Sequence, residues 1–149
     1  YHGVVRRFDF KIKNDKHVLL SDYAHHPKEI YQSAKSLKQL YSHRKITAIF
    51  QPHLYSRTKD FYKDFADALS QLDEVILCDI YPARELPIEG VTSKLIYDCL
   101  KDGVQKQMIH KEELLDLARE RDFDVLVILG AGDIESYMPQ LTKIIESKE

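Results

Sequence analysis

The spacing of hydrophobic and polar positions along this chain changes several times, and each change marks an element. Apolar and charged residues alternate in residues 6–12 (RRFDFKI), which is typical of a half-buried strand. Asn14 and Asp15 follow as a turn signal. Residues 16–23 (KHVLLSDY) then predict a second strand, which we expect to pair with the first as a hairpin.

Continuous apolar runs rich in branched residues predict buried parallel strands. These runs are ITAIFQ (46–51), EVILCDIY (74–81) and DVLVILG (124–130), and a shorter strand is expected at residues 107–110. Helical spacing fills the intervals, at residues 27–42, from Thr58 to about Leu72, at 93–100, at 111–121 and from residue 133 to near Ser147. The second helix is expected to bury Phe61, Phe65, Ala68, Leu69 and Leu72.

Strands and helices alternate regularly from residue 46 onward, which indicates an α/β domain. The expected fold is an open, mostly parallel sheet with helices on both faces and an N-terminal antiparallel edge hairpin. The length of 149 residues, with 44% apolar and 31% charged residues, suits one domain, residues 1–149. Residues 82–90 (PARELPIEG) contain two prolines and a glycine and predict a loop.

Composition excludes some classes of function. A formal net charge of −2 without a basic run argues against nucleic-acid binding. No apolar run approaches the roughly 20 residues of a membrane-spanning helix, and no signal peptide is visible. Cys78 and Cys99 lack CxxC spacing, which favours reduced thiols in a cytoplasmic protein. The chain starts at Tyr1 within structured-looking sequence, so we expect a fragment of a longer protein.

Polar segments follow four of the predicted strands. They are DYAHHP (22–27), QPHLYSRT (51–58), YPARE (81–85) and GAGD (130–133). In open parallel sheets the ligand crevice lies beyond the carboxyl ends of the strands. The sequence therefore predicts one site that unites these segments.

The chemistry of DYAHHP leaves two interpretations open. Asp22 could cap the helix that opens at Pro27 while His25 and His26 are solvated. Alternatively, the helix start binds an anion, with histidine as a tunable donor beside it. Adjacent histidines usually point apart and no HExxH or Cys/His set occurs, so no metal site is expected.

His53 and Arg57 are four residues apart in QPHLYSRT and share one face if this segment begins a helix. Arginine is the natural bidentate partner of a carboxylate or phosphate. The plainer interpretation is a surface arginine in a first turn that Ser56 caps. GAGD is either a tight turn or a source of backbone N–H groups, and Arg84 with Glu85 is expected at a rim or interdomain contact.

The sequence contains no GxxxxGK[ST] loop to cradle ATP phosphates and no activated serine or cysteine, so it reads as half of an active site. GVVRRF (3–8), DYAHHPKEI (22–30), FQPHLYSRT (50–58), YPARELPIEG (81–90) and GAGDI (130–134) occur in this order. In this combination the chain resembles the C-terminal, Rossmann-like domain of the Mur ligases. The resemblance covers Gly3 to about Ile134.

The resemblance implies a three-domain, ATP-dependent ligase of peptidoglycan synthesis, closest to the members that join L-alanine to UDP-N-acetylmuramate. ATP would phosphorylate the lactyl carboxylate, and the alanine amine would attack the acyl phosphate. ATP and Mg²⁺ would be bound mainly by a central domain absent from this chain, so the chain alone is expected to be inactive. Its expected partners are the two substrates and the enzyme's own N-terminal and central domains.

Site roles follow from the same resemblance. His25 and His53 would be catalytic, Tyr23, His26, Arg57 and Arg84 would bind substrate, and Asp22 would lie on the nucleotide side. Leu54 stands where many members have a second arginine. The resemblance therefore implies that Arg57 orients the alanine carboxylate alone or with another residue such as Arg84.

Two alternatives remain at this point. One is the related ligase that recycles murein tripeptide onto the same UDP sugar and shares a DYAHHP-like motif, although QPHLYSRT favours the alanine enzyme. The other is a stand-alone α/β binding module without catalysis. An upstream reading frame with a GKT motif would exclude the second.

Overall fold

The computed structural model describes residues 8–149, and within them the chain forms a six-stranded sheet of order β1-β2-β6-β3-β4-β5. β1 (Asp9–Lys13) pairs antiparallel with β2 (Val18–Asp22), and the other neighbours are parallel. The remaining strands are β3 (Ile46–Phe50), β4 (Glu74–Leu77), β5 (Gln105–Met108) and β6 (Val125–Leu129). The edge hairpin is confirmed, while residues 6 and 7 of its predicted first strand and most of GVVRRF lie outside the described residues.

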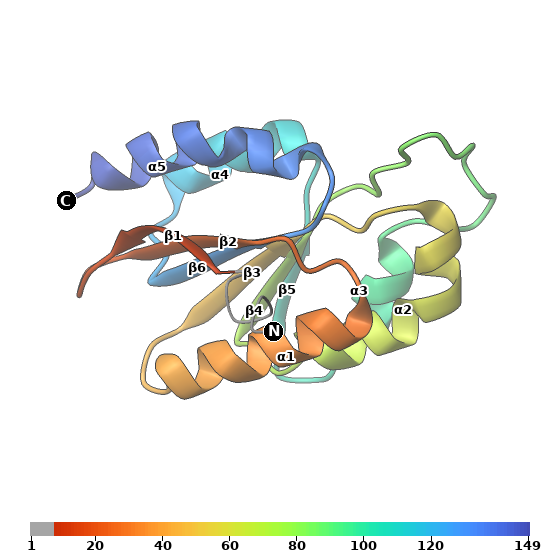
Figure 1. The fold of residues 1–149 in the computed structure, drawn as a ribbon, viewed down its shortest axis with the longest axis horizontal. Helices are drawn as coiled ribbons and strands as arrows, with labels where there is room; N and C mark the ends of the chain where they lie inside the picture. The colour runs from red at the N-terminus through yellow and green to blue at the C-terminus, as the bar shows by residue number, and fades with distance from the viewer. Residues whose placement is uncertain (1–7) are drawn as a thin grey trace, which may run out of the picture.

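Helices cover both faces of the sheet, as predicted (Figure 1). One face carries α1 (Pro27–Leu40), α2 (Tyr55–Leu69) and α3 (Lys94–Cys99), and the other carries α4 (Leu114–Glu120) and α5 (Met138–Glu146). Short 3₁₀ turns, η2 (Lys111–Glu113) and η3 (Asp133–Tyr137), precede α4 and α5. The predicted fold class is therefore confirmed.

The continuous apolar runs are explained by burial on both faces of the sheet. In β2, Leu20 packs in the cluster beneath α1 and α2, while its neighbour Leu19 packs beneath α4 and α5. All five residues of β2, β3 and β6 are buried. A parallel strand enclosed in this way has no solvent side and shows no alternation.

Several predicted boundaries were wrong. β5 begins at Gln105 rather than residue 107, and β4 ends at Leu77 rather than residue 81. The predicted helix 111–121 is divided between η2 and α4. Phe61 is 42% exposed instead of buried, and it lines an open groove beside the start of α1.

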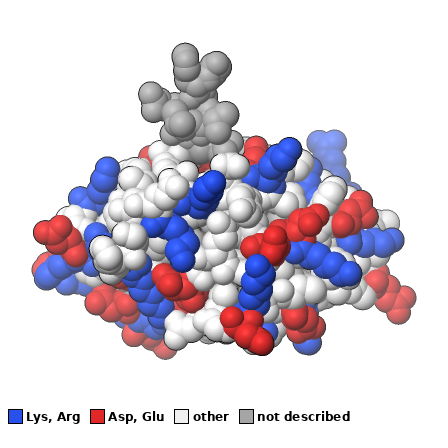
Figure 2. Space-filling model, turned by 90° about the horizontal axis from the view of Figure 1, so that it is seen from below, with Lys and Arg blue, Asp and Glu red and all other residues white. Residues whose placement is uncertain are grey.

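The surface of the domain carries mixed charge, and its two cysteines are not cross-linked. Figure 2 shows basic and acidic side chains interspersed over the face that α1 to α3 cover. Across residues 8–149 no helix is both long and apolar enough to span a membrane. Both cysteines are free, and burial raises the pKa of the Cys78 thiol to about 12, whereas Cys99 is exposed.

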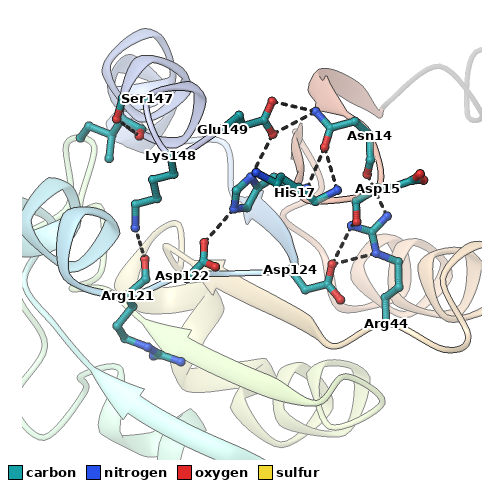
Figure 3. A network of polar contacts seen from close by, with 12 residues as sticks. Asn14, Asp15, His17, Arg44, Arg121, Asp122, Asp124, Ser147, Lys148 and Glu149 are labelled. Atoms are coloured by element: carbon teal, nitrogen blue, oxygen red, sulfur yellow. Dashed lines mark hydrogen bonds and ion pairs between the residues drawn. The ribbon is translucent and has the colours of Figure 1, made fainter.

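The amino ends of the strands are held by a network of polar contacts (Figure 3). His17, just before β2, lies between two carboxylates, with Nε2 2.7 Å from Asp122 Oδ1 and Nδ1 2.9 Å from Glu149 Oε2. Arg44, just before β3, donates from Nε to Asp124 Oδ1 at 2.7 Å. We call the group of His17, Asp122 and Glu149 the His17 clasp, and it ties the end of α5 to the hairpin.

Candidate functional site

The chain segments that follow four strands run side by side at the carboxyl edge of the sheet. The N–H of Gly130 donates to the carbonyl of Asp22 at 3.2 Å, and the N–H of Gln51 donates to Leu129 at 3.1 Å. The N–H of Cys78 donates to the carbonyl of Phe50 at 2.9 Å. These bonds extend the parallel pairing past the strands and bring together the four segments, as predicted.

Histidines from two of these segments meet in one cluster. The ring of His25 lies 5.8 Å from that of His53, edge to face, and 4.6 Å from that of His26. Tyr23 packs its ring 5.7 Å from His25 and is 57% exposed. The expectation that the adjacent histidines point apart was wrong, because the backbone turns sharply into α1 there.

Arg57 fixes the state of His53. Its Nη1 lies 3.1 Å from His53 Nδ1. A guanidinium only donates, so Nδ1 accepts and the proton of the neutral ring is on Nε2. Burial, and then the charge of Arg57, lower the pKa of His53, and partial burial followed by Arg57 lowers the pKa of His26. Both rings are therefore neutral at neutral pH.

A strained residue makes this contact possible. α2 begins at Tyr55, so His53 precedes the helix, and Leu54 between them has φ 75°. This region of φ is costly for a residue with a side chain and persists only where neighbours enforce it. The enforcing contacts are the N–H of Leu54 to the carbonyl of Tyr81 and the N–H of Tyr81 to that of Pro52, both 2.8 Å.

Tyr81 also supports His53 through its side chain, a role that the sequence did not reveal. The two rings stack at 5.6 Å with an interplanar angle of 12°. Behind them is Gly132, where an added Cβ would lie 2.7 Å from Tyr81 Cγ and 2.5 Å from Gln51 Oε1. GAGD therefore serves close packing, and its second glycine leaves the space that Tyr81 fills.

Gln51 and Lys111 hold the GAGD turn from the other side and were also missed. Gln51 is buried, donates from Nε2 to Asp133 Oδ1 at 2.8 Å and accepts from the N–H of Ile134 at 3.1 Å. Lys111 forms an ion pair with Asp133. Only the position of Gln51 directly after a strand could have indicated this role.

The capping interpretation of Asp22 was wrong. His26 occupies the N-cap position of α1, and Glu29 Oε1 accepts from the N–H groups of His25 and His26 at 3.1 and 3.2 Å. Asp22 is 2% exposed, accepts from the N–H of Ala24 at 3.0 Å and accepts from the Ser33 hydroxyl. It shapes the DYAHHP loop from within, and its role toward a nucleotide stays a prediction.

The rim of the site contains Arg84 and an open groove. Arg84 is exposed on the loop 82–90, and its neighbour Glu85 accepts hydrogen bonds from Ser56 at the start of α2. Ser56 is therefore not the N-cap that the plainer interpretation expected. A groove of about 580 Å³ adjoins the histidines and is lined by His26, Pro27, Lys28, Glu29, Phe61 and Asp64.

The donor set of the site suits organic anions and amines rather than a metal ion. Throughout the part of the chain that the structure describes, no group of three or more His, Cys, Asp or Glu side chains is arranged to hold one. Arg57 offers a fixed cation, and the neutral imidazoles offer one hydrogen-bond donor and one acceptor each.

Several known proteins are similar to this chain in sequence. Residues 6–132 match the family described as Mur ligase, glutamate ligase domain. The chain is 65% identical over 148 residues to a UDP-N-acetylmuramate–L-alanine ligase of Phocaeicola vulgatus, covering 99% of this chain and 32% of that protein. A ligase of the same name from Flavobacterium psychrophilum is 48% identical over 148 residues, or 99% of this chain and 33% of that protein.

Solved structures show the same fold. A UDP-N-acetylmuramate-alanine ligase from Thermotoga maritima aligns with a TM-score of 0.75 and 28% identity, over 97% of this chain and 30% of that one. A murein peptide ligase from Psychrobacter arcticus aligns with a TM-score of 0.72 and 16% identity, over 94% and 30%. The chain thus spans about a third of the length of the relatives it matches.

Proposed function

Because its residues 6–132 match the family domain, this chain belongs to the Mur ligase family, and we propose that it is the C-terminal domain of an enzyme that joins L-alanine to UDP-N-acetylmuramate. The names of relatives that are 65% and 48% identical support this substrate pair. We further propose that residues 1–149 are one domain of a three-domain, cytoplasmic enzyme.

In the proposed reaction a carboxylate of the UDP sugar receives phosphate from ATP, the amine of L-alanine attacks the acyl phosphate, and phosphate leaves. ATP and Mg²⁺ would be bound mainly outside this domain. The sequence has no phosphate-cradling glycine-rich loop, and the described residues provide no set of ligands for a metal ion. The task of this domain is then to bind and orient the amino acid.

Arg57 is the residue that we assign to the carboxylate of L-alanine. Its guanidinium is held by His53, only 3.1 Å away, so its position is fixed before the substrate arrives. A fixed cation orients the amino acid so that its amine faces the acyl phosphate, and such orientation lowers the barrier of the reaction.

The two histidines have complementary tautomers. His25 Nδ1 lies 3.1 Å from the carbonyl oxygen of Tyr23, which only accepts, so Nδ1 carries a proton and the tautomer that can accept a proton does so at Nε2. His53 has the opposite arrangement, with its proton on Nε2. We assign His25 to accept the proton that the ammonium of alanine loses, and His53 to donate toward the acyl phosphate.

The observation that carries this proposal is the meeting of DYAHHP and QPHLYSRT in one cluster around Arg57. The test is a ligase chimera, in which this chain replaces the matching third of the Phocaeicola vulgatus enzyme. We expect phosphate release that requires ATP, UDP-N-acetylmuramate and L-alanine together. Release that continues when L-alanine is omitted would contradict the assignment of the amino-acid site to this domain.

A further inference from the structure

Helix α2 begins without a capping side chain of its own. Leu54 at the N-cap position has no polar side-chain atom, and the first turn contains no acidic residue. The first N–H groups of a helix have no partner within the helix. The N–H of Ser56, in this first turn, therefore requires an acceptor from another part of the chain.

Glu85 supplies that acceptor from 29 residues away. Its Oε1 accepts from the N–H of Ser56 at 3.0 Å, with a sequence separation of 29, and its Oε2 accepts from the Ser56 hydroxyl. Hydrogen bonds from the hydroxyl and then from the backbone of Ser56 lower the pKa of Glu85, and the charge of Arg57 acts in the same direction. The carboxylate is ionised at neutral pH and lies close enough to Arg57 to influence it.

The residues before Glu85 form a tight turn. The N–H of Glu85 donates to the carbonyl of Pro82 at 2.9 Å, and Ala83 within the turn has φ 53°. Arg84 is the remaining residue of this turn. The rest of the loop is less constrained by burial, and Leu86 is 84% exposed.

Both ends of the turn are tied to the segment that carries the site. At one end Tyr81 exchanges two backbone hydrogen bonds with residues 52 and 54, and at the other Glu85 binds Ser56. Arg84 is therefore held between two anchors on residues 52–56. That segment also places His53 and begins the helix of Arg57.

A second cation near Arg57 has a chemical use. One guanidinium nitrogen of Arg57 already donates to His53, so fewer of its N–H groups remain for a carboxylate. Leu54 cannot supply a charge. We propose that Glu85 is a positioning residue that ties the turn 82–85 to the start of α2 and thereby holds Arg84 as the second cation for the amino-acid carboxylate. This inference rests on the proposed function.

The experiment is steady-state phosphate release by the ligase chimera with Arg84→Ala, Glu85→Ala and the double variant, each substrate varied in turn. Each single change should raise the KM for L-alanine about tenfold, the size expected for one lost hydrogen bond to a charged group, with kcat nearly unchanged. The double variant should be no worse than Arg84→Ala alone, because Glu85 acts through Arg84.

Matched controls separate positioning from general damage. Glu89→Ala removes an exposed acid of the same loop and should leave every constant unchanged. Glu85→Gln keeps an acceptor for the N–H of Ser56 and should restore part of the affinity for L-alanine. Ser56→Ala removes only the hydroxyl contact and should raise the KM for L-alanine less than Glu85→Ala does.

Two results would overturn the inference. One is a Glu85→Ala enzyme that loses kcat while its KM for L-alanine stays constant, which is the pattern of general structural damage. The other is a double variant in which the two single effects multiply. Neither can be confused with failure of the proposed function, which would already be visible in the unsubstituted chimera as phosphate release without L-alanine.

Discussion

Histidine has opposite roles at the amino ends and at the carboxyl ends of the strands, which we call the amino edge and the carboxyl edge of the sheet. At the amino edge, burial lowers the pKa of His17, but hydrogen bonds to Glu149 and Asp122 outweigh it, and the net pKa is raised. At the carboxyl edge, burial and Arg57 both lower the pKa of His53. Both ring nitrogens of His17 are hydrogen-bonded within the protein, whereas His53 keeps its Nε2–H for chemistry because Arg57 occupies Nδ1.

The two edges also differ in backbone strain. The positive φ of Leu54 lies at the carboxyl edge, beside the histidine cluster, while the His17 clasp consists of well-formed charged contacts. A fold can maintain a strained site when another region contributes stability. We therefore expect substitutions at the carboxyl edge to change catalysis and substitutions in the clasp to change stability.

The largest difference between a substitution at the carboxyl edge and one at the amino edge is expected for Arg57→Ala, measured as activity of the ligase chimera. Losing one partner of a charge-assisted pair in a closed site costs about 2–5 kcal/mol, so kcat/KM for L-alanine should fall roughly 30-fold or more. Arg57→Lys should recover only part, because lysine lacks the planar fork. In steady-state kinetics the KM for ATP should stay nearly unchanged. A rise in the KM for ATP alone would assign Arg57 to the nucleotide.

Gly132→Ala tests the support of the site rather than its chemistry. The new Cβ would overlap Gln51 and the Tyr81 ring, and overpacking of this kind costs about 1–3 kcal/mol. Because Tyr81 stacks on His53, activity of the chimera should fall as well. Urea unfolding of the isolated chain gives the stability change.

His17→Ala is the complementary change at the amino edge. We expect a loss of about 1–2 kcal/mol in the free energy of unfolding near pH 6, since one partner of the pair, Asp122, is well solvated. Alanine kinetics of the chimera should be unaffected below the unfolding temperature. His43→Ala removes an exposed histidine near the same edge and should change neither quantity.

The pH dependence of that loss is the smallest effect and the most specific. Because the folded pKa of His17 is raised above 6.5, its contribution is fully present below that value and is lost as pH rises through the folded pKa. The difference between wild type and His17→Ala should therefore shrink as the pH rises above about 6.5 and through the folded pKa. A difference that grows with pH would mean that the ring is neutral in the fold.

Local patterns and strand-end motifs predicted most of this architecture, and long-range contacts account for the failures. β2, β3 and β6 are buried throughout and were found, whereas the edge strand β5 is largely exposed and was displaced by two residues. The cap of α2 comes from Glu85 across 29 residues, and the partner of His17 in Glu149 across 132. Such pairings leave no periodic signal in the sequence.

In the candidate site, too, local motifs predicted some residues, and long-range contacts explain why others were missed. His25 and His53 could be predicted because they lie just past two strands that both pair in parallel with β6, and Arg57 because it follows His53 by four residues. Tyr81 also lies in a predicted strand-end segment, but its stacking on His53 depends on a missing side chain at Gly132. The strain at Leu54 was equally hidden, since the hydrogen bonds with Tyr81 that enforce it join segments far apart in the sequence.

The most direct test of the central claim compares two amino acceptors in the unsubstituted ligase chimera. Phosphate release with ATP and UDP-N-acetylmuramate is measured while either L-alanine or murein tripeptide is varied. A site in which Arg57 orients a small amino acid predicts saturable release with L-alanine and little with the tripeptide. Turnover of the tripeptide that equals or exceeds that of L-alanine would contradict the assignment of this domain to the alanine-adding reaction.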